Sequence, residues 1–213
     1  MGGLTFPRAR AAKGAMNLLK FLCAALPCFL MLAITAPGQS KDDREHYQFK
    51  SYTVKTEKLP ALDEYLSKAY IPAATRAGAG PVGVFREAEA NGATVVHVLT
   101  VLKAGVQPSD LDAKLSADAA YQSAGKNFVS GNPADGAYEK VETSLFAAIE
   151  GMPKIAKPDT SKPRMLNLRI YESHNERAAA KKIEMFNKSE LAIFRRVGLT
   201  PVFFGETLVG GAM

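Results

Sequence analysis

Residues 81–102, PVGVFREAEANGATVVHVLTVL, decide the fold because they contain two strand patterns joined by a tight turn. Apolar and β-branched residues dominate 81–88 and 93–102, and Asn91-Gly92 between them is a strong signal for a β-hairpin. In the second strand His97 alternates in phase with Val95, Leu99 and Val101. The pattern therefore predicts that His97 points into an apolar surface.

The sequence on either side of this hairpin completes one α+β unit. A strand is predicted at 46–54 and a helix at about 59–77, where Leu59, Leu62, Leu66, Ala69 and Ala73 form one apolar stripe that ends at Gly78 and Gly80. Downstream, a helix capped by Ser109 extends to about 128, and a last strand covers 138–149. The order β-α-β-β-α-β predicts a ferredoxin-like fold for residues 41–150.

The pattern then starts again after a linker rich in proline and lysine, 151–164. A strand is predicted at 165–171, a helix at 176–197 that ends at Gly198, and a strand at 201–205. Gly78 and Gly198 are 120 positions apart, as are Pro81 and Pro201, and Tyr52 and Tyr171 are 119 apart. Internal duplication is the simplest cause of this agreement.

Both predicted helices contain an interruption. Pro72 falls inside the first, and Asn187-Lys188-Ser189 falls inside the second. A continuous second helix would place Glu190 on its apolar stripe, where a lone carboxylate is costly. We therefore predict that the second helix restarts, with Ser189 as N-cap and Glu190 in the first turn.

Residues 165–213 hold only the first half of a second unit, strand-helix-strand. Such a half cannot cover its own sheet edge or the apolar stripe of its helix. Two explanations stay open: the chain is a truncated product, or another unit completes it. In the second case we expect self-association through sheet edges.

The first 40 residues are predicted to be an export signal. They carry four basic residues and no acidic ones, and a mainly apolar stretch, Phe21 to Ala36, is followed by small residues. A helix of that length would span about 24 Å, less than the roughly 30 Å hydrocarbon core of a bilayer. We expect cleavage near Gly38 to Ser40 and a secreted or periplasmic protein, which would meet a membrane only through an uncleaved signal.

Composition narrows the function further. The net charge is +6, of which the first 40 residues supply +4, so the remainder has no large basic surface for nucleic acid. Both cysteines, Cys23 and Cys28, lie in the predicted signal, so the exported chain would have neither a disulfide nor a thiolate nucleophile. Three histidines without metal-ligand spacing predict no metal site, and no nucleotide-binding or nucleophile motif is present. We expect no cofactor.

These features resemble the NIPSNAP family, in its secreted tandem-repeat form. The hairpin residues 82–85 and 96–99 resemble the central hairpin of that family, and 168–174, 194–198 and 201–206 resemble its second repeat. The resemblance covers most of 46–213. It implies a ferredoxin-like repeat of the dimeric α/β-barrel superfamily, and a second repeat that continues past Met213. That superfamily includes cofactor-independent monooxygenases and small-ligand binders, so the fold alone does not select a function.

Four residues are candidates for ligand binding. His97 could serve as an acid, a base or a ligand contact, with a hydrogen-bonded core histidine as the alternative. Tyr52 and Tyr171, each at the end of a predicted strand, could line a pocket, or pack across a sheet. Arg169 could attract an acidic ligand, or lie solvated at a sheet edge. No catalytic residue is assigned.

We therefore expect an exported NIPSNAP-like protein of undefined biochemical role. It would bind a small, partly apolar ligand or a partner protein through a ferredoxin-like barrel. The alternative is a cofactor-independent monooxygenase-like enzyme with His97 as acid or base. A closed cavity with His97 and a tyrosine facing inward would favour the enzyme.

Overall fold

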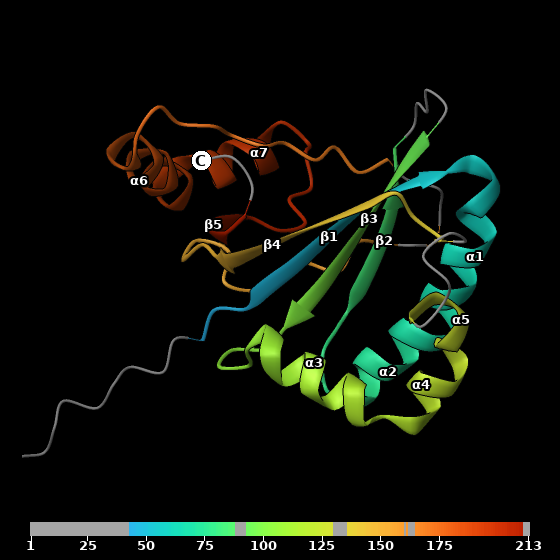
Figure 1. Ribbon diagram of the computed structural model, residues 1–213. Helices are drawn as coiled ribbons and strands as arrows, with labels where there is room; N and C mark the ends of the chain where they lie inside the picture. The colour runs from blue at the N-terminus through green and yellow to red at the C-terminus, as the bar shows by residue number, and fades with distance from the viewer. Residues whose placement is uncertain (1–42, 88–92, 130–135, 160, 162–164, 211–213) are drawn as a thin grey trace, which may run out of the picture. The chain divides into compact units, whose positions relative to one another are not determined.

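The computed structural model describes residues 43–87, 93–129, 136–159, 161 and 165–210. They form a mixed α+β protein with a five-stranded antiparallel sheet, in the order β2-β3-β1-β4-β5 (Figure 1). The predicted signal and the predicted turn at Asn91-Gly92 lie outside the described residues. Within the described residues, no helix combines the length and apolar character needed to cross a bilayer.

The central strand of the sheet is β1. It pairs with β3 along its whole length, and with β4 from His46 to Thr53. β2 pairs with β3, and β5 pairs with β4, so β2 and β5 form the two edges. The strand bounds are β1 His46–Lys55, β2 Val82–Arg86, β3 Ala93–Leu102, β4 Lys140–Ala148 and β5 Gly205–Val209.

The first long helix confirms the predicted span but changes its winding midway. A short 3₁₀ turn, η1 (Thr56–Lys58), precedes α1 (Leu59–Glu64), a π-helical segment η2 (Tyr65–Tyr70) and α2 (Ile71–Arg76). Pro72 has no N–H to donate to the carbonyl of residue 68. The wide π turn directly before it accommodates this missing hydrogen bond, so the interruption predicted at Pro72 does not end the helix. Gly78 closes the helix with φ of 89°.

The second helical stretch is broken into three: α3 (Pro108–Ala117), α4 (Ala119–Ala124) and α5 (Lys126–Val129). The predicted cap at Ser109 is wrong. Pro108 occupies the first helical position, so Gln107 becomes the N-cap, and its N–H donates to Asp110 Oδ2 at 3.0 Å. Asp118 caps α4 by accepting from the Tyr121 N–H at 2.9 Å.

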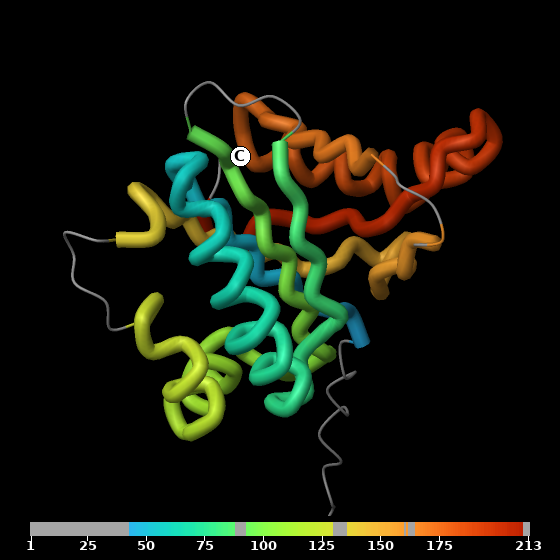
Figure 2. Tube along the Cα trace, turned by 90° about the vertical axis from the view of Figure 1, so that its right-hand side faces the viewer, coloured from blue at the N-terminus to red at the C-terminus, as the bar shows by residue number. Residues whose placement is uncertain are grey.

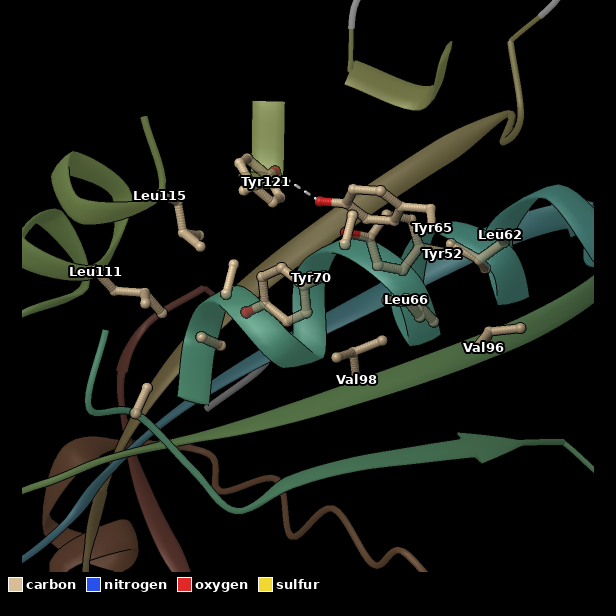
Figure 3. Close-up of a cluster of buried hydrophobic side chains, with 14 of the residues drawn as sticks. Tyr52, Leu62, Tyr65, Leu66, Tyr70, Val96, Val98, Leu111, Leu115 and Tyr121 are labelled. Carbon is tan, nitrogen blue, oxygen red and sulfur yellow. Dashed lines mark hydrogen bonds between the residues drawn. The ribbon is translucent and has the colours of Figure 1, made fainter. Parts of the chain in front are cut away.

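These helices cover one face of the sheet (Figure 2). Between them lies the main core, which is rich in tyrosine (Figure 3). Tyr65 and Tyr121 share a hydrogen bond of 2.9 Å between their hydroxyls, and Tyr65 stacks on Phe128 with centroids 3.9 Å apart. Two of the fully buried members are Leu62 and Val96. The apolar stripe predicted for the first helix faces this core.

The segment after residue 151 differs from prediction at both of its strands. Residues 165–171 do not form a strand, because no other strand of the described residues pairs with them. The strand predicted at 201–205 begins only at Gly205, and the Val202 carbonyl instead accepts from the Ala156 N–H at 2.8 Å. The resulting β5 pairs with β4.

The helix of this segment confirms the predicted span. It consists of α6 (Glu176–Met185), a π-helical η4 (Phe186–Glu190) and α7 (Leu191–Arg196). The restart with Ser189 as N-cap is wrong: the chain stays helical, and the Ser189 hydroxyl donates to the Met185 carbonyl at 3.3 Å. The helix packs through Phe186 and Leu191 against Ile149 and Met152.

Candidate binding site on the distal face of the sheet

The face of the sheet opposite α1–α5 carries the residues of chemical interest. We call it the distal face, and it is formed by the odd-numbered residues of β1 and β3. Ser51 pairs with His97 and Phe49 with Leu99 across these two strands. Phe85 of β2 lies opposite His97 on the other side. The strand pairing therefore brings a histidine, a serine and aromatic rings to one point.

His97 is held on three sides. Its Nδ1 lies 2.9 Å from Ser51 Oγ, and its ring stacks on Phe49 with centroids 5.1 Å apart and planes 19° apart. Its Nε2 lies 3.5 Å from Glu87 Oε1, and its side chain is 18% exposed. The prediction that His97 lies on an apolar face is confirmed, although both ring nitrogens have polar neighbours.

These contacts favour one tautomer. A carboxylate only accepts hydrogen bonds, so the proton is best placed on Nε2, toward Glu87. Nδ1 is then free to accept the Ser51 hydroxyl proton. The imidazole can thus accept a hydrogen bond on one side and donate one on the other, and the Phe49 ring offers flat apolar surface beside it. Phe85, the cross-strand neighbour of His97, packs its ring over Gly83 and Leu99. We call His97, Ser51, Glu87, Phe49 and Phe85 the His97 site.

The other half of the distal face is filled by side chains. Tyr47, Leu99 and Val101 are almost fully buried, with Ile155 and Phe203 packed over them. The Tyr47 and Phe203 rings meet edge to face at 5.5 Å. Burial, and secondarily the Glu45 carboxylate, raises the pKa of Tyr47. Among the described residues, this packing closes one half of the distal face to a ligand and leaves the end at His97 less covered.

The other predicted site residues do not join His97. Tyr52 lies on the opposite face of the sheet, in the main core beside Phe128 and Tyr138 (Figure 3). Burial raises its pKa. Tyr52 thus packs among other rings in the core between the sheet and the helices.

Tyr171 and Arg169 lie with the C-terminal helix. The Tyr171 ring, 43% exposed, meets Phe186 edge to face at 5.3 Å, with the Lys182 ammonium 5.4 Å from its centre. The Arg169 guanidinium lies 6.0 Å from the Phe194 ring, and its Nε donates to Asn167 Oδ1 at 3.3 Å. These two residues share a helix surface, and neither is brought to the His97 site.

Ser51 and Glu87 are site residues that the sequence interpretation missed. Ser51 has the same strand parity as Phe49, and this parity could have placed it on the distal face once β1 and β3 were paired. The signal was present in the alternation of residues 47, 49 and 51. Glu87 directly follows β2, at a position that strand periodicity does not fix.

A separate surface cleft lies beside α6, lined by Arg44, Glu150, Ala180, Ile183, Glu184, Asn187, Lys188 and Glu206. Several of its polar groups already bind one another. Asn187 Oδ1 accepts from the Gly151 N–H at 2.8 Å, and Glu184 pairs with Lys181 and Lys188. Over the described residues, no three histidine, cysteine or acidic side chains are grouped so that they could hold a metal ion.

No protein-family model matches the chain. No curated protein matches it either.

Proposed function

We propose that the protein binds a small, partly apolar ligand at the His97 site. The observation that carries this proposal is the position of His97 between the Ser51 hydroxyl and the Phe49 ring, with 18% of its side chain still exposed. A histidine fixed in this way offers a ligand a polar contact of defined direction. The adjoining Phe49 ring offers it a flat apolar surface.

Part of the proposal is that residues 46–149 are a ferredoxin-like unit. The order of elements, with β1, the first helix, β2, β3, the second helical stretch and β4, supports this. So does the strand order β2-β3-β1-β4, in which every neighbouring pair is antiparallel. In superfamilies of this fold the sheet face opposite the helices receives ligands or another sheet, which agrees with a site at His97.

We also propose that residues 165–209 belong to a second copy of this unit. The backbone hydrogen bonds at the ends of the two long helices support this second copy. The N–H groups of residues 77, 78 and 79 donate to the carbonyls of 73, 75 and 74, and those of 197, 198 and 199 donate to 193, 195 and 194. Each position in the second set is 120 beyond its counterpart in the first.

Two more features support the second copy. Both helices contain a π-helical segment at matching positions, η2 and η4. Both also carry a Glu–Lys pair one turn apart just before or within that segment, Glu64 with Lys68 and Glu184 with Lys188. Only the first helix has a proline to explain its π turn, so a shared origin explains the second more simply.

Membership of the NIPSNAP family and export from the cytoplasm complete the proposal. The motifs at 82–85, 168–174 and 201–206 support the first, and the basic-apolar pattern of residues 1–40 supports the second. Cell fractionation of the tagged full chain, with the mature N-terminus read by Edman degradation, tests export. Recovery of the intact N-terminus in the cytoplasm contradicts it.

A catalytic role at the same site is the alternative function. The contacts of Nδ1 with a hydroxyl and Nε2 with a carboxylate favour it, since this arrangement suits a general base. The tight packing around Tyr47 weighs against it, because a monooxygenase-like enzyme needs an enclosed cavity.

The test uses 2-naphthol as a probe, since it combines a flat apolar ring with one hydroxyl. The wild-type chain and His174→Ala, which changes an exposed histidine, should quench its fluorescence with equal affinity. His97→Ala should weaken binding about tenfold or more at an unchanged melting temperature. Parallel loss of binding and melting temperature in His97→Ala would make His97 a structural histidine and overturn the proposal.

A further inference from the structure

The opposite face of the central strand carries an unusual row of polar residues. Even-numbered residues of β1 face the helices, and three of them are His46, Gln48 and Lys50. The neighbouring strand β3 places mainly apolar residues on the same face, among them Val98 and Leu102. Polar side chains in such a layer are costly unless they find partners.

Two of these residues have buried side-chain atoms without a hydrogen-bond partner in the described part of the chain. They are Oε1 of Gln48, a residue that is 4% exposed, and Nδ1 of His46. The nearest hydroxyl pair does not relieve Gln48. Tyr70, on the sheet-facing side of its helix (Figure 3), and Thr100 hydrogen-bond each other at 2.8 Å. A buried amide oxygen such as that of Gln48 is stabilised when a donor reaches it.

Lys50 adds a cation to the row. Its ammonium lies 5.7 Å from the centre of the Tyr70 ring, and it forms no ion pair with any of the described residues. Burial lowers the pKa of Lys50, and the carboxylate of Asp112 partly opposes that effect. A half-buried ammonium in this position can form a charge-assisted hydrogen bond with an anion.

The Lys50 end of the row lies beside an open part of β4. Thr143 pairs with Lys50 across β1 and β4, and both Thr143 and Val141 are exposed on this face. Among the described residues, the helices therefore leave this end of β4 uncovered. Side chains two residues apart on one strand face lie about 7 Å apart, so Lys50 and Gln48 can bind the two ends of one small molecule.

We infer that Lys50 and Gln48 form a binding site for a small carboxylate that also carries a hydroxyl donor. The carboxylate binds the Lys50 ammonium and the hydroxyl donates to Gln48 Oε1, which supplies the missing partner to each. This site is on the opposite face of the sheet from His97 and does not depend on the function proposed there.

The binding test uses the full chain and three probes: 4-hydroxybenzoate, benzoate and 4-hydroxybenzamide. By ligand-observed NMR and calorimetry we expect 4-hydroxybenzoate to bind about tenfold more tightly than benzoate, which lacks the donor, or the amide, which lacks the charge. Lys50→Met should abolish this preference. Lys55→Met, the same change at an exposed end of the same strand, should keep it.

A stability test separates a ligand site from a row hydrated by water. Gln48→Leu removes an unpartnered amide oxygen and Lys50→Met removes a half-buried ammonium without an ion pair among the described residues, so each should leave the melting temperature unchanged or raise it by about 2 to 4 °C. Loss of stability in both variants would mean that the row is already satisfied by solvent and would overturn the inference. Equal affinity for all three probes, or no binding of any, would also overturn it.

Discussion

The helix at 59–76 and the helix at 176–196 are built alike and buried differently. Each has a π-helical segment, a Glu–Lys pair and a glycine with positive φ after its last turn. The first packs into a large core with many fully buried side chains, whereas the second buries little beyond Phe186 and Leu191. Local sequence thus sets how each helix winds and ends, while the packing partners set how much it stabilises the protein.

The largest test of this difference is a pair of core truncations. Leu66→Ala, at 3% exposure in the main core, should cost about 2 to 5 kcal/mol of global unfolding free energy, measured by urea denaturation. Phe186→Ala, at the matching position of the second helix, should barely change the urea midpoint of global unfolding. It should instead speed up amide hydrogen exchange in 176–196. Met185→Ala, a largely exposed neighbour, is the control. Equal losses of global unfolding free energy in Leu66→Ala and Phe186→Ala would show that the two helices unfold as one cooperative unit.

The second test concerns how the later helix docks on the chain. A Cβ on Gly151 would lie 2.9 Å from Leu191 Cδ1 and 3.1 Å from the Asn187 Cα. Gly151→Ala should therefore weaken docking by about 1 to 3 kcal/mol, visible as faster exchange in 176–196 with the main core unchanged. Glu150→Ala should have no such effect. An unchanged exchange rate in Gly151→Ala would contradict the close packing.

The third test compares the C-terminal ends of the two helices, which should lose equal stability when their glycines are replaced. Gly78 and Gly198 have φ of 89° and 81°, and a Cβ at either would meet no atom within 4 Å. Replacing either with alanine should cost about 1 to 2 kcal/mol of local helix stability from backbone strain alone, and asparagine should cost less. Native-state hydrogen exchange of the last helical turns measures both. A large difference between the two alanine variants would mean that the caps are not equivalent.

The smallest predicted effect is a difference in pKa between the glutamates of the two Glu–Lys pairs. Hydrogen bonds from Lys188 and Lys181 lower the pKa of Glu184 to about 2, and Lys68 alone lowers that of Glu64. Because the folded pKa is depressed, each pair stabilises its helix above the ordinary value of 4.5 and is lost as the pH falls through the folded pKa. Carbon-detected NMR titration should find Glu184 more acidic than Glu64, with both shifts shrinking in 1 M salt. Equal pKa values for Glu184 and Glu64 would show that Lys181 does not lower the pKa of Glu184.

Much of the fold follows from sequence where a segment has its partners within the chain. The span 93–102 matches β3 in full, and the helix at 59–76 was predicted within one residue, because apolar periodicity and burial agree there. Residues 165–171 have the same alternation, but within the described part of the chain no strand lies beside them, so the same signal gave no strand. Periodicity identifies a segment that could pair, and only the rest of the chain decides whether it does.

Predictions of local details were wrong where two sequence signals competed. At the start of α3, Pro108 overrode Ser109, because its fixed φ and missing N–H suit the first helical position. At η4 the helix widened instead of restarting, so the cap expected at Ser189 never formed. For the site, strand alternation correctly placed His97, but Tyr52 has the opposite parity and so lies on the other face. The Glu87 contact depends on where β2 ends, which no sequence pattern set.

The pairing of β5 with β4 has a consequence for synthesis of the chain. β4 is complete at Ala148, but the strand that covers its outer edge ends only at Val209, about 60 residues later. At translation rates of about 5 to 20 residues per second, that edge stays open for roughly 3 to 12 s on the nascent chain. During that interval the growing polypeptide presents an unpaired strand to its surroundings, so a holdase chaperone bound there would have to leave before β5 could dock.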